Sequence, residues 1–232
     1  ATGNNNTAVG YGAGKTVSTG TENTLMGNAA GDAVSTGADN TLLGASAGGA
    51  ISTGSNNVAI GSGALVAATT SSGHTAVGTS ALLTITTGTT GTAVGFEALK
   101  VATGNNNSAV GYQAGVAVST GTENTLVGNL AGDAVTTGAD NTFVGDNAGG
   151  AVTTASGHTA VGSSALLTMS SGTTGTAVGF EALKVATGNN NSAVGYQAGV
   201  AVSTGTENTL IGNLAGDAVT TGADNTLIGD SA

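Results

Sequence analysis

The chain repeats itself every 17 residues, and this period restricts its fold more than any other feature. An apolar residue followed by glycine recurs from Val9-Gly10 to Ile228-Gly229, with two intervals shortened to 16 residues before Gly111 and Gly195. Alanine lies three residues after every one of these glycines, and Asn, His or Gly lies four residues before. A fixed period of this length is typical of solenoids, in which each repeat forms one coil and neighbouring coils share a core.

The segment GYGAGKT, residues 10–16, resembles a phosphate-binding loop until it is placed in this repeat. A Walker-type loop needs a glycine where Val9 stands, so that backbone N–H groups can wrap the phosphates. Later coils have Asp32, Val116 and Asp133 at the position of Lys15. The residues that follow show no helical apolar period. The match to a phosphate-binding loop therefore arises by chance within the repeat, and no nucleotide site is expected.

Two segments of each coil favour extended backbone. The first is the Asn-Thr-apolar-apolar stretch before the glycine, and the second, eight residues on, reads TVST or AVST. Gly and Asn clusters between them suit corners because both residues tolerate positive φ. The sequence predicts an all-β fold, a parallel β-solenoid of fourteen coils that forms one repeat domain over residues 1–232. Equivalent residues would stack about 4.8 Å apart.

Stacking places one asparagine per coil in a column, and amides in such a column can bond to the coils on both sides. The asparagines expected to form this ladder are Asn6, Asn23, Asn40, Asn57, Asn107, Asn124, Asn141, Asn191, Asn208 and Asn225. His74 and His158 occupy the same column, where we expect them to replace one hydrogen-bonding side chain with another.

Two adjacent apolar columns precede the glycine, and neighbours on a strand point to opposite faces. We expect the column of Val9, Met26, Leu43 and Ile60 to fill the coil together with Val17, Val34 and Ile51 from the second segment. The other column would then lie outside and be buried against a partner chain. The expected interface residues are Leu25, Leu42, Leu126, Phe143, Leu210 and Leu227.

Motifs such as NNNTAVG, NNVAIG, NSAVGYQAG and TGTENTLVG resemble the head repeats of YadA-like trimeric autotransporter adhesins and, more closely, bacteriophage tail-fibre repeats. The resemblance covers the whole chain, although the coil is longer than in adhesin heads. It implies a left-handed β-roll, three chains packed side by side, and a location outside the cell or on a virion. We expect an interior shaft segment of a longer adhesive fibre, whose host or surface receptor is bound by regions outside this segment.

Composition limits the other functions. Thirteen acidic residues against three lysines give a net charge of −10, which argues against nucleic acid as a partner. No apolar run approaches the roughly 18 residues of a membrane span, so membrane insertion is not expected. No serine, cysteine or carboxylate recurs in a relation that would indicate catalysis or a cofactor site. The chain is expected not to be an enzyme.

Two further hypotheses stay open. Carboxylates that precede the ladder asparagines on consecutive coils could bind calcium through Glu22, Asp39, Asn23 and Asn40, because hard cations prefer oxygen ligands. The Thr and Ser columns resemble the surfaces of ice-binding solenoids, and this is the alternative function. The corner pair Ser18-Thr19 speaks against it, since adjacent residues cannot both face outward from a strand.

Overall fold

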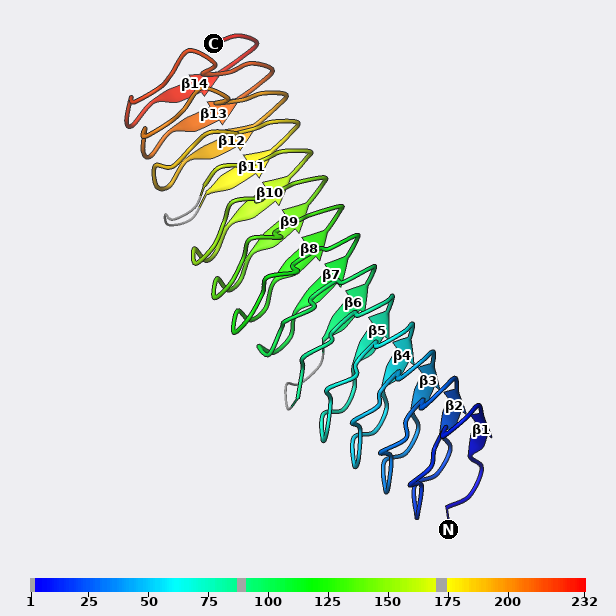
Figure 1. The fold of residues 1–232 in the computed structure, drawn as a ribbon. Coiled ribbons are helices and arrows are strands. Elements are labelled where there is room, and N and C mark those ends of the chain that lie inside the picture. Colours follow the sequence, from blue (N-terminus) through cyan, green and yellow to red (C-terminus); the bar gives the residue numbers. More distant parts are fainter. Residues whose placement is uncertain (1–2, 87–90, 170–174) are drawn as a thin grey trace. The chain divides into compact units, whose positions relative to one another are not determined.

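The computed structural model describes residues 3–86, 91–169 and 175–232. These residues form an all-β parallel β-solenoid, and no helix occurs among them. The chain divides into two compact units, Ala1–Gln113 and Ala114–Ala232. Figure 1 shows that within each unit the strands stack in chain order, one per coil. The parallel β-solenoid predicted from the period is therefore confirmed.

Each strand has three residues, so most of each coil is turn. The strands of the first unit are β1 (Thr7–Val9), β2 (Thr24–Met26), β3 (Thr41–Leu43), β4 (Val58–Ile60), β5 (Thr75–Val77), β6 (Thr92–Val94) and β7 (Ser108–Val110). Those of the second are β8 (Thr125–Val127), β9 (Thr142–Val144), β10 (Thr159–Val161), β11 (Thr176–Val178), β12 (Ser192–Val194), β13 (Thr209–Ile211) and β14 (Thr226–Ile228).

Neighbouring strands within a unit pair in parallel without any shift of register. Thr24 lies opposite Thr41, and Leu25 lies opposite Leu42. The same register holds across the 16-residue coil between β6 and β7, where Ala93 lies opposite Ala109. The repeat therefore places equivalent side chains directly above one another, as a solenoid requires.

The two apolar columns lie on the faces opposite to those predicted. Leu25, Leu42, Leu126, Phe143 and Leu210 are fully buried inside the single chain, and Leu227, in the last coil, is half-buried. They are therefore not exposed interface residues. The column of Val9, Met26, Leu43 and Ile60, expected inside, faces out.

The ladder asparagine explains this orientation. Asn23 is buried and lies two residues before Leu25, so both side chains fall on the same side of the backbone. Thr24 and Met26 then share the outer face. The invariant alanine column, represented by Ala47, and the second-segment residues Val34 and Ile51 complete the interior.

The second segment of the coil is not a regular strand in the described residues. At the first corner, the N–H groups of Ser18, Thr19 and Gly20 all donate to the carbonyl oxygen of Ser35, at 2.9, 3.2 and 3.1 Å. Three donors on one acceptor cannot form the evenly spaced bonds of a parallel ladder. The segment still joins neighbouring coils, but it does so as a turn.

The glycine after each strand is required by close contact between coils. Gly44 has φ of 137°, and a β-carbon there would lie 2.6 Å from the carbonyl oxygen of Gly61. The next coil occupies the space of any side chain at this position. Glycine therefore recurs after every strand because the coils stack through their backbones here.

Candidate functional site

The asparagine column forms a continuous set of hydrogen bonds within runs of coils. Nδ2 of Asn40 donates to Oδ1 of Asn23 at 2.9 Å and to the carbonyl oxygen of Gly54 at 2.9 Å. The backbone N–H of Asn40 also donates to Asn23 Oδ1, at 3.1 Å. Asn141 and Asn208 repeat this pattern with Asn124 and Asn191. The ladder is therefore a structural element, whose side-chain amides join neighbouring coils.

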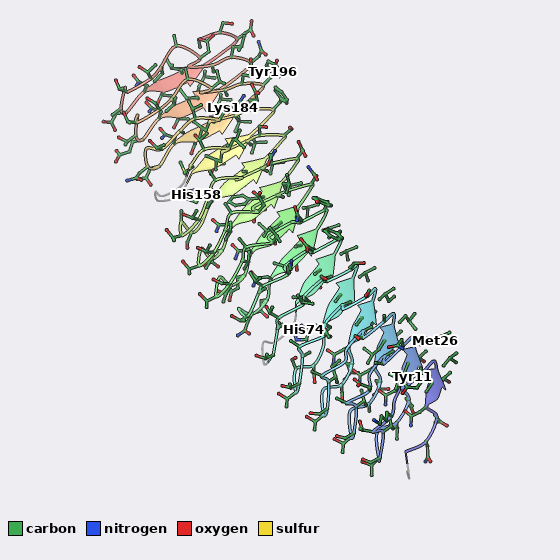
Figure 2. All side chains as sticks on the ribbon, in the orientation of Figure 1. Tyr11, Met26, His74, His158, Lys184 and Tyr196 are labelled. Carbon is green, nitrogen blue, oxygen red and sulfur yellow. The ribbon has the colours of Figure 1, made fainter. Side chains whose placement is uncertain are left out.

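The outer face of the sheet is the most regular surface of each unit. The third residue of every strand is Val, Ile, Leu or Met and points outward. These side chains range from half-buried to exposed, with 44% of Met26 and 42% of Val194 accessible; Met26 is labelled in Figure 2. None of the strands contains a charged residue. Each unit therefore carries an unbroken apolar column on this face.

A hydroxyl column runs beside the apolar one. The first residue of each strand is Thr or Ser, with Val58 as the exception. Within the described residues, none of these strand hydroxyls takes part in a side-chain hydrogen bond to protein. The corner serines differ, because Ser18 and Ser35 donate to the next coil at 3.0 and 3.1 Å. The strand hydroxyls, unlike the corner ones, remain available to water or a partner.

An aromatic pair and an ion pair share one corner in each unit. Phe96 stacks on Tyr112 with ring centroids 5.4 Å apart and planes 10° apart, and Phe180 stacks on Tyr196 in the same way. About half of each tyrosine is exposed. The two rings of each pair come from neighbouring coils, so the pair adds to the contact between coils while both rings stay partly exposed.

Glu97 carries the polar part of this corner. Its carboxylate accepts from Lys100 Nζ at 2.7 Å and from Gln113 Nε2 at 2.8 Å. The hydrogen bond from Lys100 lowers the pKa of Glu97 most, followed by that from Gln113. Glu181 has the same bonds from Lys184 and Gln197, and its pKa is lowered for the same reasons. These carboxylates remain ionised, as surface contacts between coils.

The calcium hypothesis is not supported by the geometry. Glu22 and Asp39 are exposed at corners with φ near 60°. Oδ1 of Asn23 is buried and already accepts two hydrogen bonds from Asn40. The amide oxygens therefore do not join the carboxylates in one site. No group of three or more metal-binding side chains occurs in the part of the chain that the structure describes.

The described residues enclose no pocket, and none of them forms a helix that could cross a membrane. What the arrangement offers is an uncharged outer face on which a hydroxyl column and an apolar column run side by side. The column predicted for this face, that of Leu25, lies inside instead, and the aromatic corner was not predicted. The motif FEALK followed sixteen residues later by YQAG, present in both units, could have indicated the latter. No family model, no curated protein and no solved structure matches the chain.

Proposed function

We propose that the chain is a shaft segment of an extracellular adhesive fibre, in which three copies pack side by side through the outer faces of their sheets. The observation that supports this is the uncharged column of Val, Ile, Leu and Met that faces outward on all the strands. A monomer would leave this column in water, and contiguous apolar surface of this kind marks an interaction site. No catalytic activity is proposed.

The partner that fits this face best is a second copy of the chain. Copies share the same axial repeat of about 4.8 Å, so contact between apolar columns in one coil recurs in the next. The free energy gained per coil is small, but it adds over all the coils of each unit. A foreign partner would need the same unusual repeat. The number three and the location outside a cell or on a virion come from the resemblance to fibre repeats.

Mass measurement on charged variants tests the packing. Val194→Lys with Ile211→Lys places two charges on the exposed apolar column, and sedimentation should then change from trimer to monomer. Thr204→Lys with Thr221→Lys is the matched control, because both threonines are exposed at a corner of the same coils. The control should remain trimeric. A monomeric unsubstituted chain would contradict the proposal.

Ice binding is a second candidate, and one observation favours it. On the outer face the strand hydroxyls and the apolar side chains are two residues apart, so both columns face the same way at regular spacing. The objection from the adjacent corner pair does not apply to this face. A monomer that partitions into growing ice, and loses this with Thr142→Lys but not with Thr154→Lys at a corner, would favour ice binding over the fibre.

A further inference from the structure

The asparagine ladder is interrupted twice, each time by a histidine followed by a glycine. The N–H of His74 donates to Asn57 Oδ1 at 3.0 Å, as an asparagine would. One coil on, the N–H of Gly91 donates to Nδ1 of His74, also at 3.0 Å. In the second unit, His158 accepts from the N–H of Gly175 at 2.8 Å. Both imidazoles, labelled in Figure 2, are fully buried.

The glycine and the histidine replace two asparagines as one unit. A β-carbon at Gly91 would lie 3.4 Å from His74 Nδ1 and 3.4 Å from Leu82 Cδ1. At Gly175 the corresponding distances are 3.3 Å to His158 Nδ1 and 3.5 Å to Leu166 Cδ2. A β-carbon at Gly91 would therefore make ordinary contacts, and one at Gly175 would be only slightly tight against the ring. What each glycine contributes is its N–H, which donates to the ring nitrogen.

This geometry requires a neutral imidazole. Nδ1 accepts a hydrogen bond, so its lone pair must be unprotonated, and a protonated ring would instead direct an N–H group at the N–H of the glycine. A buried positive charge would also need a counter-charge. The sequence contains no Asp, Glu, Lys or Arg between Asp39 and Glu97, or between Asp146 and Glu181. The charged residues in the neighbouring coils are Glu97 and Lys100 beyond His74, and Asp146, Glu181 and Lys184 around His158. Each glutamate is paired with the lysine of its own coil, and Asp146 accepts a hydrogen bond from Asn129.

We propose that these two His-Gly steps, His74 with Gly91 and His158 with Gly175, are acid-sensitive points at which protonation of the ring loosens the contact between neighbouring coils. The histidines favour the folded state when neutral, so their contribution to stability is complete above the ordinary titration range of imidazole, near pH ~6.5. It is lost as the pH falls below this range, because the unfolded chain takes up protons that the folded chain refuses. The proposal does not depend on how the outer faces pack.

The chain itself supplies the test variant. His74→Asn with Gly91→Asn, combined with His158→Asn and Gly175→Asn, restores the asparagine pairs found elsewhere in the ladder. Urea unfolding of the intact chain would be compared at pH 7.5 and 5.5. The unfolding equilibrium constant of each unit of the unsubstituted chain should rise about tenfold between these values, as expected for one histidine that stays neutral when folded. The asparagine variant should lack this increase.

Carboxylates titrate in both proteins, so the difference between them isolates the histidines. An equal pH effect in both, or no effect in the unsubstituted chain, would overturn the proposal. If the variant fails to fold, the NMR resonances of the histidine ring nitrogens in the unsubstituted chain test the proposal instead. Unprotonated Nδ1 that persists in the folded protein at pH 5.5 supports the proposal. Reversible protonation near pH ~6.5 with the fold intact refutes it.

Discussion

Gly149 leaves the space that the ring of Phe143 occupies. A β-carbon on Gly149 would lie 2.7 Å from Cζ of Phe143, a distance that real contacts do not reach. One coil on, the sizes are exchanged: the strand residue is Ala160 and the corner residue is Leu166, and both are buried. The core of these coils thus holds one large side chain, supplied either by the strand or by the corner.

Making residue 149 large and residue 143 small in the same chain should therefore cost less stability than making either change alone. Gly149→Leu overfills the coil and should destabilise by about 1–3 kcal/mol, and Phe143→Ala empties it and should cost about 3–5 kcal/mol. The double variant reproduces the Ala160–Leu166 arrangement. Leu166 itself has φ of 50°, so leucine is accepted in this backbone conformation. We expect the double variant to be more stable than Phe143→Ala.

Urea unfolding of the two single variants and the double variant gives the coupling free energy directly. Ala45→Leu, on a corner outside the core column, controls for a general effect of added apolar area. Simple additivity of the two core substitutions would mean that the side chains do not share one space.

The solenoid and its ladder follow from the period, because a repeat of 17 residues with asparagine at one position leaves few other ways to stack backbone and amide groups. Hydrogen bonds such as Asn40 to Asn23 need only the period and the residue type. The lengths of the strands were less predictable. Convergence of three N–H groups on Ser35 depends on corner geometry that residue preferences do not specify.

The direction of the apolar columns could not be read from hydrophobicity, since both Leu25 and Met26 are apolar. Asn23 shows which column is inside, because it lies two residues before Leu25 and its buried amide is on the same side of the backbone. The hydroxyl column supplies the same information, because Thr24 marks the outer face on which Met26 also lies. Residues two positions after the ladder asparagine would then have been assigned to the interior, which is where they lie.

The glycine after a strand should be irreplaceable. Gly44→Ala introduces a β-carbon 2.6 Å from a carbonyl oxygen of the next coil, at a backbone conformation whose strain alone costs about 1–3 kcal/mol. We expect a loss of about 3 kcal/mol or more in unfolding free energy. Gly63→Ala is the control: φ is 66°, but the nearest atom would be 3.6 Å away, so only about 1–2 kcal/mol should be lost. Equal losses would show that contact between coils is not the cause.

An aspartate in the ladder should weaken it although its shape is nearly the same. Asn141 Nδ2 donates to Asn124 Oδ1 and to the carbonyl oxygen of Ala155, both at 3.0 Å. Asn141→Asp removes both donors and places a buried carboxylate against these oxygens, so we expect a loss of at least about 2 kcal/mol. Asn28→Asp, at an exposed corner, should change stability little. Thermal unfolding at pH 7 compares the two.

Protonation of the carboxylates at the aromatic corners should make the protein less stable in acid. The pKa of Glu97 is lowered from the ordinary 4.5 mainly by the hydrogen bond from Lys100. A lowered pKa in the folded state means that the contribution is present above 4.5 and is lost as the pH falls through the folded value. Glu97→Gln with Glu181→Gln should flatten the pH dependence of unfolding below this value. The effect should shrink in high salt, since both carboxylates are exposed to screening.

Asp133 should have the opposite effect to Glu97 and make the protein less stable as the pH rises. Its Oδ1 is shielded from water and has no hydrogen-bond partner in the structure, and desolvation raises its pKa more than the N–H groups of Asp133 and Ala134 lower it. A raised pKa of a carboxyl group in the folded state favours the protonated form, so the charge costs stability as the pH rises above the ordinary 3.8. Asp133→Asn should therefore raise the unfolding midpoint at pH 7 and make little difference at pH 3. Asp217 occupies the same repeat position but is exposed, and Asp217→Asn should change neither midpoint. A gain at pH 7 that is equal for both variants would mean that net charge, and not burial of Asp133, is responsible.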